Sequence, residues 1–282
     1  MYKITNKKML DSNTFLMDIE APRIAKSCLP GQFVIVRSDE KSERIPLTIC
    51  DYDTNRGTVT VVFQALGIST RKISTYEVDE SFLDFVGPLG HPSDLLNEDL
   101  EVLRNKSIVF VADGIGAAHV YPQVKWLYEQ GIDADVIVGC ESKEHLLLEK
   151  EMRTISANSY IATNDGSYGY KGSAEELLRE LIENERKNYD YIVAVAPMTM
   201  MKSICEFTKG FGIKTIVSLK QIMIDGIGLC GGCRVTVGGE TKFTCIDGPE
   251  FDGHLVDFEE AIRRQAIYKK EEAHKCRVGL NL

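Results

Sequence analysis

Three closely spaced cysteines and one aspartate are the residues whose types and spacing point most directly to chemistry. Asp225, Cys230, Cys233 and Cys245 follow the pattern Asp-x4-Cys-x2-Cys-x11-Cys, and the first part of this segment is rich in glycine. The plant-type [2Fe–2S] loop has the spacing Cys-x4-Cys-x2-Cys with a distant fourth cysteine. Three positions match, and Asp225 occupies the first. Glycine permits the positive φ angles that wrap a loop around a cluster and aim its N–H groups at sulfur.

Two alternatives stay open at this loop. Zinc also accepts three thiolates and a carboxylate, although structural zinc sites usually show two short-spaced ligand pairs and this loop has one. Asp225 either ligates iron or only accepts N–H groups and so shapes the loop. The other five of the eight cysteines are scattered singly and are expected to be ordinary free thiols: Cys28, Cys50, Cys140, Cys205 and Cys276.

Two segments in the first hundred residues have the composition of a phosphate and ring site. Arg44-Ile45-Pro46-Leu47-Thr48 ends a predicted strand, where the arginine can hold a pyrophosphate while the following backbone and hydroxyl face a flat ring. Gly67, Ser69 and Thr70 look like the start of a helix whose N-terminus binds phosphate. Taken alone, each segment is better explained as an edge-strand proline or an ordinary capped helix. The prediction of a phosphate and ring site depends on the order of the two segments, both of which precede a nucleotide-type turn.

That nucleotide-type turn is Asp113-Gly114-Ile115-Gly116. It follows an apolar predicted strand and opens a helix, so its glycines let the backbone approach a pyrophosphate at the helix N-terminus. Glu141 follows the next strand, where an acidic residue can accept from both ribose hydroxyls and repel a 2′-phosphate. Because the neighbouring Lys143 weakens this inference, the sequence favours NAD(H) and leaves NADP(H) open.

The elements that must position these motifs divide into two kinds. Up to about residue 100, short β-branched and aromatic runs between turn signals predict a small barrel, with strands at 15–19, 33–36, 45–49, 58–63 and 82–86. After about residue 105, strands at 107–112, 134–139, 159–163, 191–196 and 214–219 alternate with helical stretches near 117–130, 174–186 and 198–210, which predicts a parallel sheet.

The last sixty residues form a third kind of segment. A hairpin with arms at 234–237 and 242–245 returns Cys245 to the other cysteines, and a final helix is expected from Phe258 to Ala273 with Asp257 as its N-cap. We therefore expect three domains: a barrel over residues 1–100, an α/β domain over 101–220, and a cluster segment with a terminal helix over 221–282.

Composition excludes several classes of protein. The net charge of −9 and the pI near 5.2 argue against nucleic acid as a partner, because its phosphates bind to a positively charged protein surface. The polar N-terminus lacks the apolar region of a secretory signal, and the longest apolar run, 108–112, is too short to span a bilayer. We expect a cytoplasmic protein, with no membrane partner, whose cysteines do not form a disulfide framework.

The order of these segments resembles the ferredoxin–NADP reductase superfamily, in which a flavin barrel with an Arg-x-Pro-Leu-Thr type motif precedes a pyridine-nucleotide domain. The appended cluster segment is similar to the electron-transfer subunits related to that of dihydroorotate dehydrogenase. The stretch from Cys245 to Phe258 also looks like the small subunit type of sulfide dehydrogenase and of NADH-dependent reduced ferredoxin:NADP⁺ oxidoreductase. The chain departs from the family at the nucleotide turn, where Asp113 and His119 stand in place of Gly and Pro.

The resemblance implies FAD in the barrel, along Arg44, Pro46, Leu47 and Thr48, with Gly67, Ser69 and Thr70 completing the phosphate site. It also implies that Asp165 and Gly166 belong to a nucleotide loop and that Met198 lies beside the nicotinamide. A plain turn and a core methionine are the alternatives for Asp165 and Met198. His119 and His254 belong to no ligand spacing, and we assign neither a role.

The chemistry expected is hydride transfer between nicotinamide and flavin, followed by single-electron transfer to the cluster, with no catalytic side chain required. The resemblance further implies a larger partner subunit, with its own flavin and iron–sulfur clusters, that contacts ferredoxin and NADP(H). The chain is then the NAD(H)-side module of an electron-bifurcating transhydrogenase. The alternatives are the electron-transfer subunit of dihydroorotate dehydrogenase, against which Asp225 argues, that of sulfide dehydrogenase, and a non-catalytic iron–sulfur redox sensor.

Overall fold

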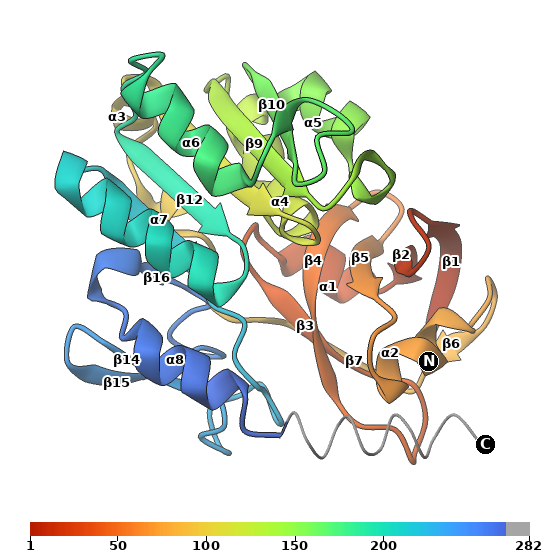
Figure 1. The fold of residues 1–282 in the computed structure, drawn as a ribbon. Coiled ribbons are helices and arrows are strands. Elements are labelled where there is room, and N and C mark those ends of the chain that lie inside the picture. Colours follow the sequence, from red (N-terminus) through yellow and green to blue (C-terminus); the bar gives the residue numbers. More distant parts are fainter. Residues whose placement is uncertain (269–282) are drawn as a thin grey trace.

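The first ninety residues fold into a strongly curved antiparallel sheet, seen in red to orange in the computed structural model of the chain, which describes residues 1–268 (Figure 1). The strand order is β6-β1-β2-β5-β4-β3-β7. Only Leu83 separates β6 from β7, so the two end strands meet and nearly close a barrel. The strands are β1 (Tyr2–Met9), β2 (Thr14–Glu20), β3 (Phe33–Arg37), β4 (Ile45–Asp53), β5 (Thr58–Gln64), β6 (Ser81–Phe82) and β7 (Asp84–Leu89).

Each predicted barrel strand is present, with two differences. The predicted run 82–86 is divided between β6 and β7. Strand β1 was not predicted, because its sequence YKITNKKM is polar; only Ile4 is fully buried along it. Two short helices, α1 (Pro22–Ser27) and α2 (Ile68–Ser74), connect barrel strands. The barrel prediction is confirmed.

The second sheet is parallel over six of its seven strands, in the order β11-β10-β9-β8-β12-β13-β16. Its strands are β8 (Ile108–Asp113), β9 (Ala134–Cys140), β10 (Ser159–Thr163), β11 (Tyr170–Lys171), β12 (Tyr191–Val195), β13 (Lys214–Ser218) and the antiparallel β16 (Glu250–Asp252). Apolar residues run without alternation along β8, β9 and β12 because helices cover both faces.

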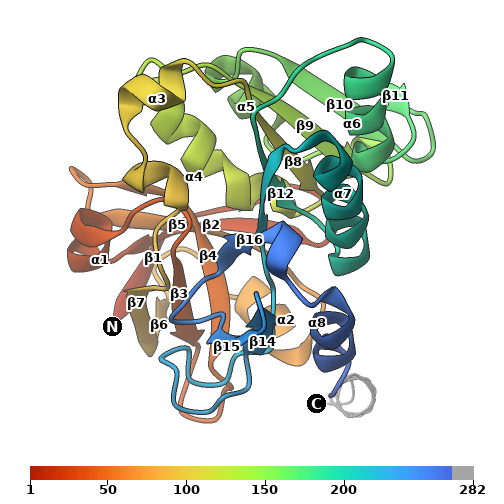
Figure 2. The same ribbon diagram turned by 90° about the vertical axis from the view of Figure 1, so that its left-hand side faces the viewer.

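Two separate apolar cores flank this sheet. On one face, α6 (Ala174–Glu183) and α7 (Met198–Phe211) pack against the central strands. On the other face, α4 (Gly116–Glu129) packs with α5 (Glu149–Ile155) and also lies against barrel strand β4. Figure 2 shows α4 between the sheet and the barrel. The connection from the barrel contains the short helices η1 (Asp94–Asn97) and α3 (Leu100–Arg104), and η2 (Lys143–His145) follows β9.

The C-terminal segment, blue in both views, packs beside the barrel and the parallel sheet (Figures 1 and 2). Its hairpin pairs β14 (Arg234–Val237) with β15 (Glu240–Phe243) across Gly238-Gly239, whose φ angles of 61° and 81° suit a two-residue turn. Strand β16 extends the parallel sheet, η3 (Gly253–Leu255) follows it, and α8 runs over Phe258–Gln265.

Helix α8 begins as predicted. The Asp257 side chain accepts a hydrogen bond from the N–H of Glu260, at 2.9 Å. Residues 269–273 of the predicted terminal helix, and Cys276, lie outside the described residues. Within residues 1–268, no helix is long and apolar enough to cross a membrane, and the seven cysteines there are free thiols.

One glycine is required where the parallel sheet meets α4. A Cβ atom at Gly116 would lie 2.0 Å from the carbonyl oxygen of Val195, in the neighbouring strand β12. We expect Gly116→Ala to lower the free energy of unfolding by about 1–3 kcal/mol or more, because backbone must move to admit the methyl group. Thermal and urea unfolding measure the change.

Gly210→Ala in α7 is the matched control. A Cβ there meets nothing within 4 Å, so alanine should stabilise the helix by about 0.5–1 kcal/mol. Equal stability of the two variants would contradict the close contact.

Candidate cofactor sites

A cavity of about 280 Å³ lies between the barrel and the parallel sheet. Four predicted flavin residues line it: Pro46, Leu47, Thr48 and Thr70. Phe33, Phe63 and Gln64 add two aromatic walls and an amide from the neighbouring strands. The barrel thus presents an apolar slot with polar groups at its edge, the form that suits a flat heteroaromatic ring.

The other wall of this cavity was not predicted from sequence. It consists of Ile115, His119 and Gln123 from α4 and its start, residues 218–221 at and beyond the end of β13, Met223, and Pro249 and Glu250. Apart from Ile115, which belongs to the nucleotide-type turn, these residues carry no motif, and only the packing of α4 and β13 against the barrel brings them to the cavity. His119 Nδ1 lies 2.8 Å from the carbonyl oxygen of Ile115, whereas His254 Nε2 pairs with the Thr208 hydroxyl at 3.1 Å.

One buried oxygen atom in the cavity wall lacks a hydrogen-bond donor, and this lets us ask whether the wall fits a flavin. Gln221 is 5% exposed, and its Nε2 donates to the carbonyl of Ala261 at 3.1 Å. Its Oε1 accepts no hydrogen bond within the described residues. An unsatisfied buried acceptor costs about 1–3 kcal/mol. An occupant with an N–H at its edge, as the flavin ring has, would satisfy this acceptor, so the wall fits the group.

The remaining predicted flavin residues lie around the cavity. Gly67 is the N-cap of α2, and the Thr70 hydroxyl accepts the N–H groups of Leu66 and Gly67, each at 3.1 Å. Ser69 donates to Glu43 at 3.3 Å. Arg44, about half exposed, reaches Asp84 at 3.5 Å. The helix therefore starts where the sequence predicted, while phosphate binding by Arg44, Gly67 and Ser69 stays a prediction.

Three buried polar side chains close a ring of hydrogen bonds beside the cavity. The Ser93 hydroxyl lies 2.8 Å from Glu250 Oε2 and 3.1 Å from Gln123 Oε1, and Gln123 Nε2 donates to Glu250 Oε1 at 2.6 Å. Ser93 precedes η1, Gln123 belongs to α4 and Glu250 to β16. A protonated Glu250 completes the ring, because it donates to Ser93, which then donates to Gln123. Burial raises the pKa of Glu250 to about 7, which favours this neutral form.

The predicted nucleotide turn lies where the strand order reverses. β8 continues to β9 on one side, while β12 lies on its other side, and ligands of such sheets bind outside the carboxyl ends of the strands at this point. Asp113 ends β8, Gly114 has a φ of 52°, and Gly116 begins α4. Burial raises the pKa of Asp113, while Lys220 acts in the opposite direction.

The other predicted nucleotide residues differ in their exposure: three lie at the surface and one is buried. Glu141, exposed after β9, accepts from Asn164 Nδ2 at 2.9 Å. Asp165 accepts the N–H of Ser167 at 2.9 Å, its hydrogen bonds to Ser167 lower its pKa, and Gly166 has a φ of 75°. These three residues gather at the carboxyl ends of β9 and β10. Met198 is instead 4% exposed and belongs to the core beside α6 and α7.

The cysteine loop brings two of its thiols together. Cys233 and Cys245 are each 1% exposed, with their Sγ atoms 3.2 Å apart, and the N–H of Cys245 points to Cys233 Sγ at 3.5 Å. Cys230 is exposed, and its Sγ accepts the N–H of Gly232 at 3.4 Å. Burial, with Cys233 adding to it, raises the pKa of Cys245 to about 12. Because metals bind thiolates, a bound cation must offset this penalty.

Asp225 accepts two backbone N–H groups of the loop. Ile227 donates to Oδ1 at 2.9 Å and Cys230 to Oδ2 at 2.5 Å. This is the loop-shaping role, and iron ligation by Asp225 stays a prediction. Within residues 1–268, no three Cys, His, Asp or Glu side chains surround one point closely enough for a single metal ion. Thiols with N–H groups aimed at sulfur fit a two-iron cluster.

The flavin cavity and the cysteine pair share a wall. Phe33, Ile35, Cys233 and Cys245 form one buried apolar cluster, against which Leu89, Met223 and Phe243 pack. Phe33 and Met223 also line the flavin cavity. From the other side, Arg264 of α8 braces the loop by donating to the carbonyls of Gly232 and Arg234, each at 3.1 Å.

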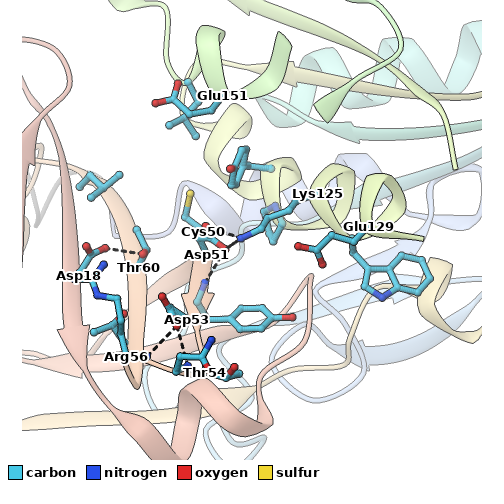
Figure 3. A pocket seen from close by; sticks show the side chains of 18 residues that line it. Asp18, Cys50, Asp51, Asp53, Thr54, Arg56, Thr60, Lys125, Glu129 and Glu151 are labelled. Atoms are coloured by element: carbon cyan, nitrogen blue, oxygen red, sulfur yellow. Dashed lines mark hydrogen bonds and ion pairs between the residues drawn. The ribbon is translucent and has the colours of Figure 1, made fainter. Parts of the chain in front are cut away.

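A second, larger cavity of about 600 Å³ contains none of the predicted residues (Figure 3). It lies between the far end of β4 and α4. Some of its charged groups contact one another within the wall: Lys125 binds Asp51 at 2.7 Å, Thr60 donates to Asp18 at 2.6 Å, and Asp53 accepts the N–H groups of Asn55 and Arg56. We assign it no ligand, because no predicted cofactor or metal residue lines it.

Comparison with known proteins agrees with this arrangement. The family profile of the iron-sulfur cluster binding domain of dihydroorotate dehydrogenase B matches residues 220–257. A Thermotoga maritima protein named as a homologue of the dihydroorotate dehydrogenase B (NAD(+)) electron transfer subunit is 38% identical, over 96% of this chain and 92% of its own length. A Clostridium beijerinckii protein of the adh 3′ region is 55% identical over the same shares.

A solved structure is similar over nearly the whole chain. It is a chain of the NADH-dependent reduced ferredoxin-NADP oxidoreductase, studied for flavin-based electron bifurcation, with a TM-score of 0.89, 36% identity and coverage of 99% of this chain and 98% of that one. A flavin-type barrel joined to a nucleotide-type sheet and an iron–sulfur loop defines an oxidoreductase module of the ferredoxin–NADP reductase type. Within that class, the chain belongs to the family of dihydroorotate dehydrogenase B electron-transfer subunits and their homologues. The predicted family and fold class are confirmed.

The hydrogen-bonded ring predicts how stability depends on pH. The pKa of Glu250 is raised from 4.5 to about 7 in the folded state. The protonated carboxyl therefore contributes to the free energy of unfolding in full below pH 4.5, and this contribution is lost as the pH rises through 7. The loss amounts to at most about 3 kcal/mol. Glu250→Gln mimics the neutral acid, so it should lack this loss and exceed the native chain in stability at pH 8. Urea unfolding at pH 5 and pH 8 measures both proteins.

Glu250→Ala is the control for the ring itself. It leaves Gln123 Nε2 buried without an acceptor, so we expect a loss of about 1–3 kcal/mol at both pH values. Parallel pH profiles for the native chain and Glu250→Gln would show that Glu250 does not titrate in this range.

Proposed function

We propose that this chain is the NAD(H)-side electron-transfer subunit of an electron-bifurcating NADH-dependent reduced ferredoxin:NADP⁺ oxidoreductase, carrying FAD and one [2Fe–2S] cluster. The single observation that supports this most is the shared wall: Phe33 and Met223 line the flavin cavity and pack in the cluster that contains Cys233 and Cys245. The family and the similar bifurcating structure support the same proposal.

When bound, FAD takes a hydride from NADH and the cluster accepts electrons one at a time. The residues of the chain hold these groups in place. Thr48, Gln64 and Gln221 edge the ring cavity, while Gly114 and Gly116 let backbone approach the nucleotide. The buried thiols of Cys233 and Cys245 hold the cluster against the barrel, and Asp225 fixes the backbone between them and the exposed Cys230. The three ranges 1–100, 101–220 and 221–282 are proposed as the corresponding units.

We also propose a larger partner subunit that contacts ferredoxin and NADP(H). The exposed apolar residues around Cys230 support this, because they surround the loop that carries the exposed thiol of the proposed cluster: Ile224, Ile227, Leu229 and Ile246. The free thiols of residues 1–268 agree with a cytoplasmic location. A subunit of dihydroorotate dehydrogenase or sulfide dehydrogenase is the alternative, since the partner decides the second substrate.

The first experiment is an anaerobic NADH titration of the purified chain, followed by visible absorbance. We expect the flavin bands to bleach together with the broad iron–sulfur absorption. A colourless protein that contains zinc, or a coloured one that ignores NADH, would contradict the proposal and favour a structural or sensor role.

Removing one cluster thiol should separate the two halves of the chemistry. We expect Cys230→Ser to keep its flavin and its bleaching by NADH but to lose broad cluster absorption and electron delivery to the partner, because serine replaces a thiolate ligand. Cys28→Ala, at a free thiol in the barrel core, should leave both intact. Unimpaired delivery by Cys230→Ser would refute this route.

Replacing Glu141 tests the choice of nucleotide. We expect Glu141→Gln to lower the ratio of kcat/KM for NADH to that for NADPH by about tenfold or more, because a charged acceptor for the ribose hydroxyls, worth about 1.5–3 kcal/mol, is lost. Dye-linked steady-state kinetics give both values. Glu144→Gln, at the next exposed carboxylate, should leave the ratio unchanged. An unchanged ratio in Glu141→Gln would mean that this carboxylate does not bind the ribose hydroxyls.

A further inference from the structure

A lysine in the wall of the flavin cavity has no ion pair. Lys220 follows β13 and lines the cavity. Within residues 1–268, its ammonium has no carboxylate within 4 Å and no hydrogen-bond acceptor; Asp113 is the one charge that raises its pKa, from farther away. Burial is the larger effect and lowers the pKa of Lys220 to about 8. A positive charge held in such a place gains stability from any negative charge that enters the cavity.

The backbone that carries this lysine is fixed on both sides. Gln265 of α8 donates to the carbonyl of Lys220 at 3.0 Å, and the next residue, Gln221, donates to the carbonyl of Ala261 in the same helix at 3.1 Å. On the preceding side, the N–H of Leu219 donates to the carbonyl of Pro249 at 2.9 Å. The lysine stem therefore starts from a rigid point, and its charge stays near the cavity.

The groups that interact with Lys220 are the two departures from the family at the nucleotide turn. Asp113 is the one carboxylate whose charge acts on the Lys220 ammonium, and each residue shifts the pKa of the other toward its charged form. His119 lines the same cavity, and burial together with Lys220 lowers its pKa to about 3, so the imidazole is neutral near pH 7. The titratable groups at this point are thus the Lys220 ammonium in the cavity wall, the Asp113 carboxylate that acts on it, and Glu250 of the same wall, whose carboxyl belongs to the hydrogen-bonded ring.

We propose that Lys220 raises the reduction potential of the flavin ring bound in this cavity and that Asp113 opposes it. The proposal rests on the proposed function, because it requires FAD in the cavity. Accepting a hydride adds two electrons and one proton to the ring, so the ring becomes more negative by one charge. A nearby ammonium favours that state and a nearby carboxylate disfavours it, and both effects are strong where burial excludes water. Lys220 and Asp113 are therefore tuning residues of opposite sign.

The test is the midpoint potential of the flavin, measured by anaerobic redox titration of the flavin absorbance of the full chain. We expect Lys220→Met to lower the equilibrium constant for flavin reduction by roughly tenfold, which is about 30 mV for a two-electron couple. Lys220→Arg keeps the charge and should stay near the native value. Asp113→Asn removes the opposing charge and should raise the potential.

Lys26→Met is the matched control, because Lys26 is an exposed lysine of α1 that does not line the cavity. Its potential should equal that of the native chain. If Lys220→Met fails to retain flavin, Lys220→Gln, which removes the charge but keeps a polar side chain, should show the same downward shift.

The outcomes separate this inference from the proposed function. A native chain that binds no flavin, or whose flavin ignores NADH, overturns the proposed function. A native chain with a normal NADH-reducible flavin, whose potential is unchanged in Lys220→Met and in Asp113→Asn, overturns the tuning role alone. A shift of both variants in the same direction also overturns it, because opposite charges must act in opposite directions.

Discussion

The hydrogen-bonded ring of Ser93, Gln123 and Glu250 is the contact on which the flavin cavity depends. Each member comes from a different part of the chain: the connection after the barrel, helix α4 and strand β16. No one of these parts forms the cavity by itself. The ring joins three buried polar groups, each of which would be costly to leave unpaired. Its geometry therefore fixes the distance between the barrel slot and the wall that β13 and α4 present to it.

The position of the cysteine loop follows from the same arrangement. β16 carries Glu250 and follows Cys245 by a few residues, so the strand that completes the ring also anchors the end of the loop. Cys233 and Cys245 are thereby packed against Phe33 of the barrel, while Arg264 fixes the loop from α8. Two redox groups, if bound in these places, are separated by little more than one layer of side chains.

Sequence reasoning succeeded where a local rule governs the outcome. Turn glycines, short apolar runs and the N-cap Asp257 depend on a few neighbouring residues, and they predicted the barrel, the parallel sheet and α8. Strand β1 was missed because its pairing with β2, not its polar sequence, makes it a strand. Glu250 and Lys220 could not have been found, since a buried charged residue looks like a surface residue until distant segments enclose it. Asp225 was predicted with two roles, and its contacts in the structure match the backbone-binding one.

The cavity also links cofactor supply to the amount of folded protein. Its walls come from positions as far apart as Phe33, Phe63, Ile115 and Lys220, which adjoin one another only in the folded chain. A ligand that binds there has no comparable site in the unfolded chain, so binding stabilises the fold by RT ln(1 + [L]/Kd), about 2.7 kcal/mol when free ligand is a hundred times its Kd. In a cell short of flavin, the chain would unfold more often and be degraded faster, so that its abundance follows the flavin supply.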